Sequence, residues 1–486
     1  MPGWARAAAW TAGVSALLLL IYPVGFPNYD TIYALLWGRE IAGLDSPDQS
    51  APLAPTPHPL LELFGAVASP LGDGAITATV VLAYIALGLI GYLVYRLGAT
   101  WFDRPVGALA AVIVLTRAPY LSNGLRAYVD LPFIALCLAA LLVETKRPRA
   151  GWPVLALLAA AGLLRPEAWL FSFAYLAYLA IARPREGADA GARRWRLRTE
   201  LLRERSGLLL IALAGAAPLG WAIFDWITAG SPTYSFTGTR ETVEELERQT
   251  GPVDLVLYGP RRLGEVLQWP GMVGAAAGVV LGLALMRRRA LVGVAGAALA
   301  LAAFAVLGSA GLAIIPRYTM LAAAILAVFA AAALLGWRLL EPDHRWRRAW
   351  QATAAVVALM FVVWLPNQYD LLSQVDTDLS NQKLVEDDLE KLADSGAFDP
   401  LCGLVGVPNH RAVPRLAFWL DATASDFVSY SEETQPARGY FLEPTSEFVV
   451  ENFLLDPGDP TDLDAEPPLG FKQVAANDSW RLFRRC

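Results

Sequence analysis

The chain has 486 residues, of which 56% are hydrophobic and only 17% are charged. Ordinary soluble domains carry about 25% charged residues, so this composition excludes a typical soluble enzyme and indicates a protein of the lipid bilayer. The formal net charge of -6 adds little, because the orientation of a membrane protein depends on where lysine and arginine lie rather than on their total.

Apolar segments that approach or reach the length needed to cross about 30 Å of hydrocarbon recur from residue 8 to about residue 366. The first follows Arg6 and has no small-residue cleavage site after it, so we interpret it as a retained signal anchor. The third to fifth segments are short enough for one of them to be re-entrant. The pattern predicts about 11 transmembrane helices, near residues 8–25, 74–95, 106–120, 131–143, 152–164, 168–182, 208–228, 271–286, 291–313, 318–337 and 350–366.

The distribution of basic residues predicts which loops face the cytoplasm. If the N terminus is cytoplasmic, the most basic short loops also fall on that side, as the positive-inside rule requires; these are 144–151, 182–207, 285–291 and 337–350. The opposite face then holds the loops 26–73, 121–130, 165–167, 229–270 and 314–317. We therefore expect an integral plasma-membrane protein with a transmembrane domain at 1–366 and an extracytoplasmic domain at 367–486.

The last 120 or so residues turn polar and contain short strand-like pieces such as "LCGLVGV" and "SWRLFRRC". This pattern predicts a small α+β domain. Cys402 opens it and Cys486 closes it, so on an oxidising side of the membrane the two are candidates for a disulfide, with a pair of free thiols as the alternative. Cys137 lies inside an apolar segment and is expected to be an inert core residue.

Two acids lie where predicted spans reach the outer face. Asp30 in "NYDTIYALLWGREI" follows the first span and precedes a short amphipathic helix with Tyr29, Tyr33 and Trp37 on one face. Asp130 in "VDLPF" begins the fourth span. Either acid would also serve as an ordinary helix cap, and the aromatic residues would also suit an interfacial belt. As a pair, the carboxylates are candidates for acid and base chemistry or for a divalent-cation site.

Two arginines lie at the same face. Arg165 and Glu167 flank a proline in the tight junction "GLLRPEAW", and Arg317 precedes Tyr318 in "IPRYTM". An interfacial ion pair or simple snorkelling to the headgroups would account for them. Arginine also binds phosphate through bidentate, charge-assisted hydrogen bonds. Further polar candidates in the outer loops are Arg126, Tyr234 and His58, the last as a phosphate or metal contact or an ordinary loop histidine.

In this order the motifs resemble the GT-C superfamily of polytopic glycosyltransferases, which includes protein mannosyltransferases and the lipid A aminoarabinose transferase. The resemblance rests on the acid in a long first outer loop, the Pro-rich "APTPHPLLELF", the acid-Leu-Pro start of the fourth span, "GLLRPEAW" and "PRYTMLAAAIL". It covers the chain through about residue 366. Relatives often read "KPPL" where this chain has "PHPL", and some carry an adjacent pair of acids that is missing here.

The resemblance implies transfer of a sugar from a polyprenyl-phosphate donor to an acceptor hydroxyl, usually with inversion. It implies that Asp30 is the base and that Asp130 is a second acid that orients the acceptor or holds a metal. Donor-phosphate contacts would come from Arg165, Arg317, His58 and Arg126, and substrate contacts from Tyr29, Tyr33, Trp37, Glu167, Tyr234 and Tyr318. The resemblance leaves the acceptor open among glycan, lipid and protein, and the one cofactor that the two acids would suit is a divalent cation.

Two other functions fit the same composition. A transporter or flippase of lipid-linked glycans would also have a polar cavity among many spans, although its charged residues would lie nearer mid-membrane and this sequence has no inverted repeat. A non-catalytic scaffold for cell-envelope assembly is the second alternative. We expect membrane lipids and no nucleic acid among the partners, and the sequence has neither a Gly-rich nucleotide-binding loop nor zinc-ligand spacing.

Overall fold

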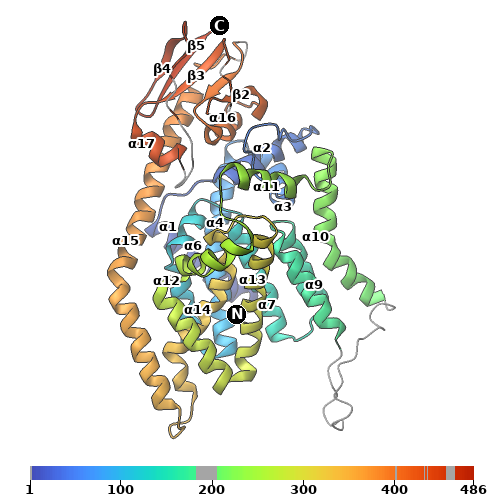
Figure 1. Ribbon diagram of the computed structural model, residues 1–486, viewed down its shortest axis with the longest axis vertical. Coiled ribbons are helices and arrows are strands. Elements are labelled where there is room, and N and C mark those ends of the chain that lie inside the picture. The colour runs from blue at the N-terminus through green and yellow to red at the C-terminus, as the bar shows by residue number, and fades with distance from the viewer. Residues whose placement is uncertain are drawn as a thin grey trace.

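The computed structural model describes residues 3–181, 205–399, 402–431, 433–434, 436–455, 463 and 466–486. Figure 1 shows an elongated molecule with a bundle of helices below and a small sheet domain at the top. Seven of the described helices are long and apolar enough to cross a membrane. They are α1 (Gly3–Ile21), α4 (Gly74–Trp101), α10 (Arg205–Ala229), α12 (Gly251–Leu285), α13 (Arg287–Ser309), α15 (Arg347–Asp394), and α14 (Met320–Leu335) with the 3₁₀ turns on either side of it, which extend the segment to Pro316–Leu339.

The remaining helices of the bundle are shorter. They are α2 (Tyr29–Ala42), α3 (Pro59–Ala68), α5 (Arg104–Leu115), α6 (Ala118–Leu125), α7 (Asp130–Lys146), α8 (Trp152–Gly162), α9 (Glu167–Ala180) and α11 (Tyr234–Glu245), with 3₁₀ turns at Ser69–Leu71, Pro316–Thr319 and Gly336–Leu339. The prediction of a helical, multi-spanning membrane protein is confirmed. The total of 11 spans stays a prediction, because α7, α8 and α9 are each under 18 residues long.

Two predicted segments differ from the structure in the same region. The predicted span 106–120 is broken into α5 and α6, which meet at 62°. The predicted loop 229–270 instead holds α11 and the first half of α12, whose backbone breaks at Gln268 with φ 60°. The two breaks face each other, because an Nη1 hydrogen of Arg117 is donated to the Gln268 side-chain oxygen over 2.6 Å. A buried polar contact therefore joins the two irregular points.

Helix α15 links the bundle to the sheet domain. It continues through Pro366 and the predicted domain boundary without a break and ends at Asp394, at the foot of the sheet domain in Figure 1. Its second half is amphipathic, so its polar composition resembles that of a loop while its apolar face is buried. Val385 and Leu389 on that face are fully buried in the core of the sheet domain.

The C-terminal domain contains a five-stranded mixed sheet in the order β2-β1-β3-β5-β4. The strands are β1 (Val405–Val407), β2 (Phe427–Ser429), β3 (Gly439–Pro444), β4 (Lys472–Ala476) and β5 (Trp480–Arg485). Strand β1 pairs in parallel with β2 and β3, and β5 is antiparallel to β3 and β4. Helical turns at His410–Ala412, Val413–Trp419 (α16), Ala424–Asp426, Glu447–Val449 (α17) and Val450–Leu454 complete it. The predicted α+β domain is confirmed.

The sheet domain is docked on α2. Tyr33 and Trp37 of α2 are fully buried in the domain's hydrophobic core. The Arg39 guanidinium donates hydrogen bonds to the carbonyl oxygens of Ala417, Phe418 and Ala422 at 3.2, 3.1 and 3.0 Å. These apolar and polar contacts fix α2, and with it the residues at its N-terminal end.

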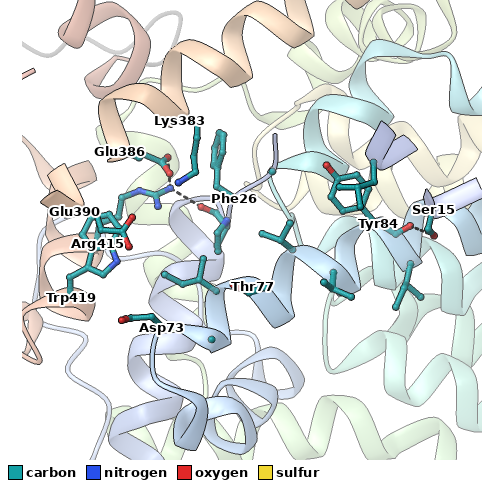
Figure 2. Close-up of a pocket in the computed structure, with 18 of the residues that line it drawn as sticks. Ser15, Phe26, Asp73, Thr77, Tyr84, Lys383, Glu386, Glu390, Arg415 and Trp419 are labelled. Carbon is teal, nitrogen blue, oxygen red and sulfur yellow. Dashed lines mark hydrogen bonds and ion pairs between the residues drawn. The ribbon is translucent and has the colours of Figure 1, made fainter. Parts of the chain in front are cut away.

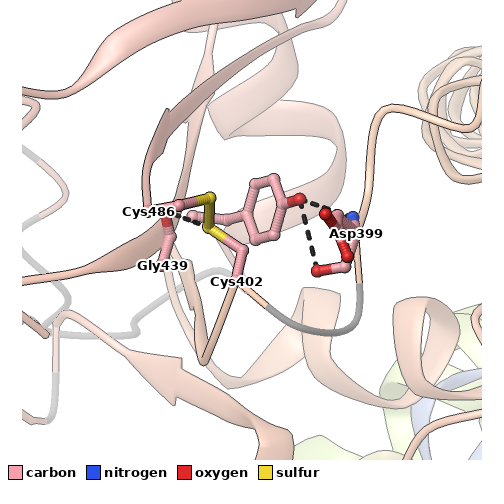
Figure 3. The surroundings of a disulfide bond; sticks show 5 residues. Asp399, Cys402, Gly439 and Cys486 are labelled. Carbon is pink, nitrogen blue, oxygen red and sulfur yellow. Dashed lines mark hydrogen bonds between the residues drawn. A yellow bond between two sulfur atoms is a disulfide. The ribbon is translucent and has the colours of Figure 1, made fainter.

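The structure joins Cys402 and Cys486 by a disulfide that closes an 84-residue separation around the sheet (Figure 3). Alkylation of the unfolded protein without reductant should therefore label Cys137 alone, and all three cysteines of the chain should react after reduction. The Cys402→Ser variant should show two reactive thiols without reductant. Three reactive thiols in unreduced wild-type protein purified from an oxidising compartment would contradict the pairing.

Candidate active site

Asp30 lies in the first turn of α2 but does not cap it. The cap is Asn28, whose side-chain oxygen accepts a hydrogen bond from the Thr31 backbone N–H at 3.0 Å. The Thr31 hydroxyl donates to the Ala127 carbonyl at 2.8 Å, and the Asn28 N–H donates to the Arg126 carbonyl at 2.8 Å. The Asp30 carboxylate therefore does not cap the free N–H groups at the start of α2. The residues on either side of Asp30 anchor this turn to the 126–127 segment.

Helix α3 brings His58 to the same region. Helices α2 and α3 cross at Gly38 and Gly65, where a Cβ on Gly38 would lie 2.5 Å from the Gly65 carbonyl carbon and one on Gly65 would lie 2.4 Å from the Ala34 carbonyl oxygen. Only glycine allows so close a backbone approach. The crossing fixes the start of α3, where His58 is the N-cap residue.

Asp30 faces Arg317 from the 3₁₀ turn before α14. A carboxylate oxygen of Asp30 and an Nη of Arg317 are 3.3 Å apart, and the two side chains are 20% and 23% exposed. The Arg317 guanidinium lies 5.3 Å from the ring centroid of Tyr128 and 5.5 Å from that of Tyr318. The pair is thus held by aromatic rings but open enough for a ligand to reach both charges.

A second, fully buried ion cluster lies beside the first. Arg165 is paired with Asp130, and its Nη2 is 2.5 Å from a carboxylate oxygen of Glu167. All three side chains are at most 8% exposed. The Tyr318 ring lies between the clusters, with its centroid 4.3 Å from the Arg165 guanidinium carbon. Asp130 pairs with Arg165 and makes no capping hydrogen bond at the start of α7. Asp130 is therefore not a helix cap.

His58 is a neutral group between charged ones. Burial is the main cause that lowers its pKa to about 4, and the nearby Arg165 and Arg317 lower it further, whereas Asp30 and Asp130 raise it. At neutral pH the imidazole is therefore uncharged. The imidazole can therefore take part in hydrogen bonds but supplies no positive charge.

Four buried polar atoms of this region have no hydrogen-bond partner within the described residues. They are Nδ1 of His58, Oε2 of Glu62, Oδ2 of Asp130 and Nε of Arg317. Most buried polar atoms in proteins are paired, so this cluster retains unused hydrogen-bonding capacity.

Other predicted site residues lie elsewhere. Tyr33 and Trp37 are buried beneath the sheet domain, and the Trp37 indole donates to the Asp48 carbonyl at 2.8 Å. The Tyr33 ring packs against those of Tyr29 and Trp37, with centroids 5.0 and 4.9 Å away. Their amphipathic spacing reflects two covered faces of α2 rather than an aromatic face open to substrate.

Tyr29, Arg126 and Tyr234 make contacts with neighbouring segments. The Tyr29 hydroxyl donates to the Leu53 carbonyl at 3.1 Å, and the Tyr234 hydroxyl lies 3.5 Å from the Gln49 carbonyl. Nε of Arg126 donates to the Gln382 side chain of α15 at 3.1 Å. These contacts hold the 43–58 loop and α15 in place around the site.

Sequence reasoning missed Tyr128, Trp221 and Glu62. Tyr128 precedes Asp130 by two residues and contacts Arg317, so its place in the same outer loop was an available signal. The Trp221 ring lies 6.0 Å from that of His58. Glu62 accepts the His58 backbone N–H at 3.0 Å, a contact that its i+4 spacing from His58 permits.

The residues present do not fit a divalent-cation site. Asp30 is paired with Arg317 and Asp130 with Arg165, so a cation between the acids would meet two fixed positive charges. Over the described ranges, no group of three or more His, Cys, Asp or Glu side chains is placed to hold a metal. In this geometry the positive charge beside the two carboxylates comes from arginine side chains rather than from a metal ion.

The pH dependence of stability should reveal the ionisation of the Glu62 carboxyl group. Burial raises its pKa to about 8 from an ordinary value of 4.5, although the His58 hydrogen bond lowers it. An acid with a raised pKa in the folded state contributes stability that is present below its unfolded pKa and is lost as the pH rises through the folded value. The unfolding temperature should therefore fall between about pH 5 and pH 8. Glu62→Gln should make the unfolding temperature less dependent on pH over this range, whereas the exposed control Glu245→Gln should behave as wild type. If the unfolding temperature of all three proteins depends on pH in the same way, Glu62 is not the group responsible.

The solved structures show what this fold resembles. No protein-family model matches the chain, and no curated protein matches its sequence. The structure of ArnT from Cupriavidus metallidurans bound to undecaprenyl phosphate is similar, with a TM-score of 0.54, 14% identity, and coverage of 99% of this chain and 98% of that one. The apo structure of the same protein gives the same values.

A second protein is more distant. The oligosaccharyltransferase AglB from Archaeoglobus fulgidus, solved with an inhibitory peptide and a dolichol-phosphate, has a TM-score of 0.45, 12% identity, and coverage of 87% of this chain and 64% of that one. The assignment of the fold rests on ArnT, whose similarity extends over both the helical bundle and the C-terminal domain. The chain therefore has the fold of ArnT.

Proposed function

We propose that this protein is a glycosyltransferase that moves a sugar from a polyprenyl-phosphate donor to an acceptor hydroxyl. The observation that carries the proposal is the partly exposed Asp30–Arg317 pair beside buried polar atoms that lack partners. A base and a phosphate ligand are the two groups that this reaction requires. The ArnT fold, solved with undecaprenyl phosphate, supports the choice of donor.

Asp30 and Arg317 exchange partners during the proposed reaction. The donor phosphate binds Arg317 and releases Asp30 from its ion pair. The freed carboxylate removes the proton from the acceptor hydroxyl as its oxygen attacks the anomeric carbon. The bond from that carbon to the phosphate oxygen breaks, and the phosphate leaves with the electron pair. Attack opposite the leaving group inverts the anomeric centre.

Arg165 has a supporting role in this proposal. Its guanidinium is already occupied by Asp130 and Glu167, so Arg317 rather than Arg165 makes the direct phosphate contact. The Tyr318 ring lies against both guanidinium groups, so the buried cluster helps to position Arg317. Neutral His58 adds a hydrogen bond to the phosphate without adding charge.

The proposed orientation puts the site on the extracytoplasmic side. The sheet domain, α2 and α3 gather at one end of the molecule in Figure 1, and α15 begins near the opposite end. The basic segment 337–350 leads into α15 at that opposite end, which is consistent with a cytoplasmic location under the positive-inside rule. Of the predicted basic loop 182–207, residues 182–204 lie outside the described residues. The disulfide supports an oxidising environment for the sheet domain.

The test is sugar release from a panel of polyprenyl-phosphate sugars by purified protein supplied with a cell-envelope extract. Wild type should release sugar from at least one donor into a larger product. Arg317→Gln should raise the KM for that donor by about tenfold or more, since a hydrogen bond to a charged group is worth about 1.5–3 kcal/mol. Arg261→Gln, an exposed arginine of α12, is the matched control. Binding of donors without release from any of them would support a transporter or scaffold instead.

A further inference from the structure

A cavity of about 640 Å³ lies where the sheet domain meets the bundle, and none of Asp30, Arg317 and His58 lines it. Figure 2 shows that its two ends differ. One end is lined by α1 and α4, around Ser15 and Tyr84, and the other by charged side chains of α15 and by α16. A space with one apolar and one charged end is shaped for an amphiphile.

The apolar end opens toward the bilayer. Leu19 of α1 and Val81 and Ile85 of α4 line the cavity and are 50%, 50% and 42% exposed. Both helices are long and apolar enough to cross a membrane. Large apolar side chains exposed on membrane-spanning helices face lipid rather than water, so an acyl or prenyl chain can enter the cavity from the side.

The charged end is unsuited to an anionic headgroup. Arg415 is buried against Glu386 at 2.6 Å, and Lys383 is paired with Asp387, so both cations are already neutralised. The other lining carboxylates, Glu390 and Asp73, have no ion pair among the described residues. The lining therefore has three carboxyl groups and two cations, an arrangement that accepts hydrogen bonds from hydroxyls and is poorly suited to phosphate.

An aromatic group completes the polar end. Trp419 lines the cavity, and its indole N–H is buried without a partner in the described part of the chain. Phe26 is also part of the lining, but its ring is buried against the guanidinium groups of Arg126 and Arg415. Aromatic faces pack against the C–H faces of sugar rings, while an indole donor and free carboxylates bind sugar hydroxyls.

We propose that this cavity is a second lipid site, which takes a lipid with an uncharged, hydroxyl-rich headgroup. If the proposed function holds, this lipid is the acceptor class of the transfer. Pro27 lines the cavity, and its carbonyl accepts a hydrogen bond from Arg415 at 2.7 Å. Asp30 follows three residues later in the chain, in the first turn of α2. The donor phosphate and the acceptor lipid thus bind at chemically distinct places.

Photolabelling in lipid nanodiscs tests the site without requiring sugar transfer. The probe is a dioleoyl galactosyl glycerol with a diazirine in one acyl chain, and the comparison is a dioleoyl phosphatidylglycerol with the same diazirine. The galactolipid should label peptides of α1 and α4 that line the cavity. Thr77→Trp, which fills the cavity from α4, should lower this labelling about tenfold or more. Leu82→Trp, on another face of α4, is the matched control and should label as wild type.

Charge reversal tests the headgroup preference and does not depend on filling the cavity. Glu390→Lys should shift the preference toward phosphatidylglycerol by about tenfold, and Asp378→Lys, exposed on the same helix, should leave it unchanged. Equal labelling by both lipids in wild type, or undiminished labelling of Thr77→Trp, would overturn the proposal.

The proposed function and the lipid site can fail separately. Asp30→Asn should be labelled as strongly as wild type, because it removes the base and not the cavity. Labelling without sugar transfer from any donor would keep the lipid site and remove the proposed function. Transfer to a water-soluble acceptor, with no labelling by the galactolipid, would keep the transferase and overturn the lipid site.

Discussion

Asparagine in place of Asp30 should lower the rate of sugar transfer at saturating donor by about 10²- to 10⁴-fold, the usual contribution of a general base. The amide has nearly the same shape but cannot take the acceptor proton. The Asp30–Arg317 pair is partly exposed and therefore adds little to stability, so the variant should fold normally. Single-turnover sugar transfer and equilibrium donor binding, measured on the same preparation, separate the chemical step from affinity.

The control for this variant is Asp45→Asn, which changes an exposed acid just beyond the end of α2. It should transfer sugar at the wild-type rate. Donor affinity of Asp30→Asn should be unchanged or higher, because the substitution removes a carboxylate that competes with phosphate for Arg317. Wild-type turnover by Asp30→Asn would remove Asp30 from the chemistry and leave its ion pair as a structural contact.

Alanine in place of Arg165 should destabilise the protein by about 3–5 kcal/mol, the usual result of removing one partner from a buried ion pair. The change leaves the Asp130 and Glu167 carboxylates buried without their common cation. Chemical unfolding in detergent micelles, followed by tryptophan fluorescence, measures the loss. Purification yield should fall in parallel, since a loss of this size is a large part of the stability of a typical domain.

Arg317→Ala is the matched comparison for Arg165→Ala. Its ion pair with Asp30 is partly open to solvent, so the loss of stability should be about 1 kcal/mol or less. Its loss of donor affinity should nevertheless be the larger of the two. Equal destabilisation by both substitutions would show that the buried cluster is no more important to the fold than the open pair.

The sequence predicted which residues gather at the site better than it predicted their partners. Asp30, Asp130, Arg165 and Arg317 all lie at the ends of apolar segments on one predicted face, and alternating spans bring such ends together. Pairing Asp30 with Arg317 and Asp130 with Arg165 required the arrangement of the helices in space. Helices α7 and α8 lie between residues 130 and 165 in the sequence, and no local sequence pattern predicts how these helices pack.

Local signals were ambiguous where two physical explanations used the same residues. Asn28 and Asp30 are both good helix caps, and only the structure shows that Asn28 makes the capping hydrogen bond. Tyr33 and Trp37 give the amphipathic pattern of an open aromatic face, but the sheet domain covers that face. The second half of α15 is polar enough to resemble a loop, and its helix is stabilised by packing against residues far along the chain.

The position of a bound polyprenyl phosphate tests the central claim most directly. A cryo-electron microscopy structure with undecaprenyl phosphate should show the phosphate in contact with the Arg317 guanidinium and the His58 imidazole, with Asp30 released from Arg317. A phosphate bound beside Lys383 and Arg415 in the cavity under the sheet domain, with the Asp30–Arg317 pair intact, would contradict it.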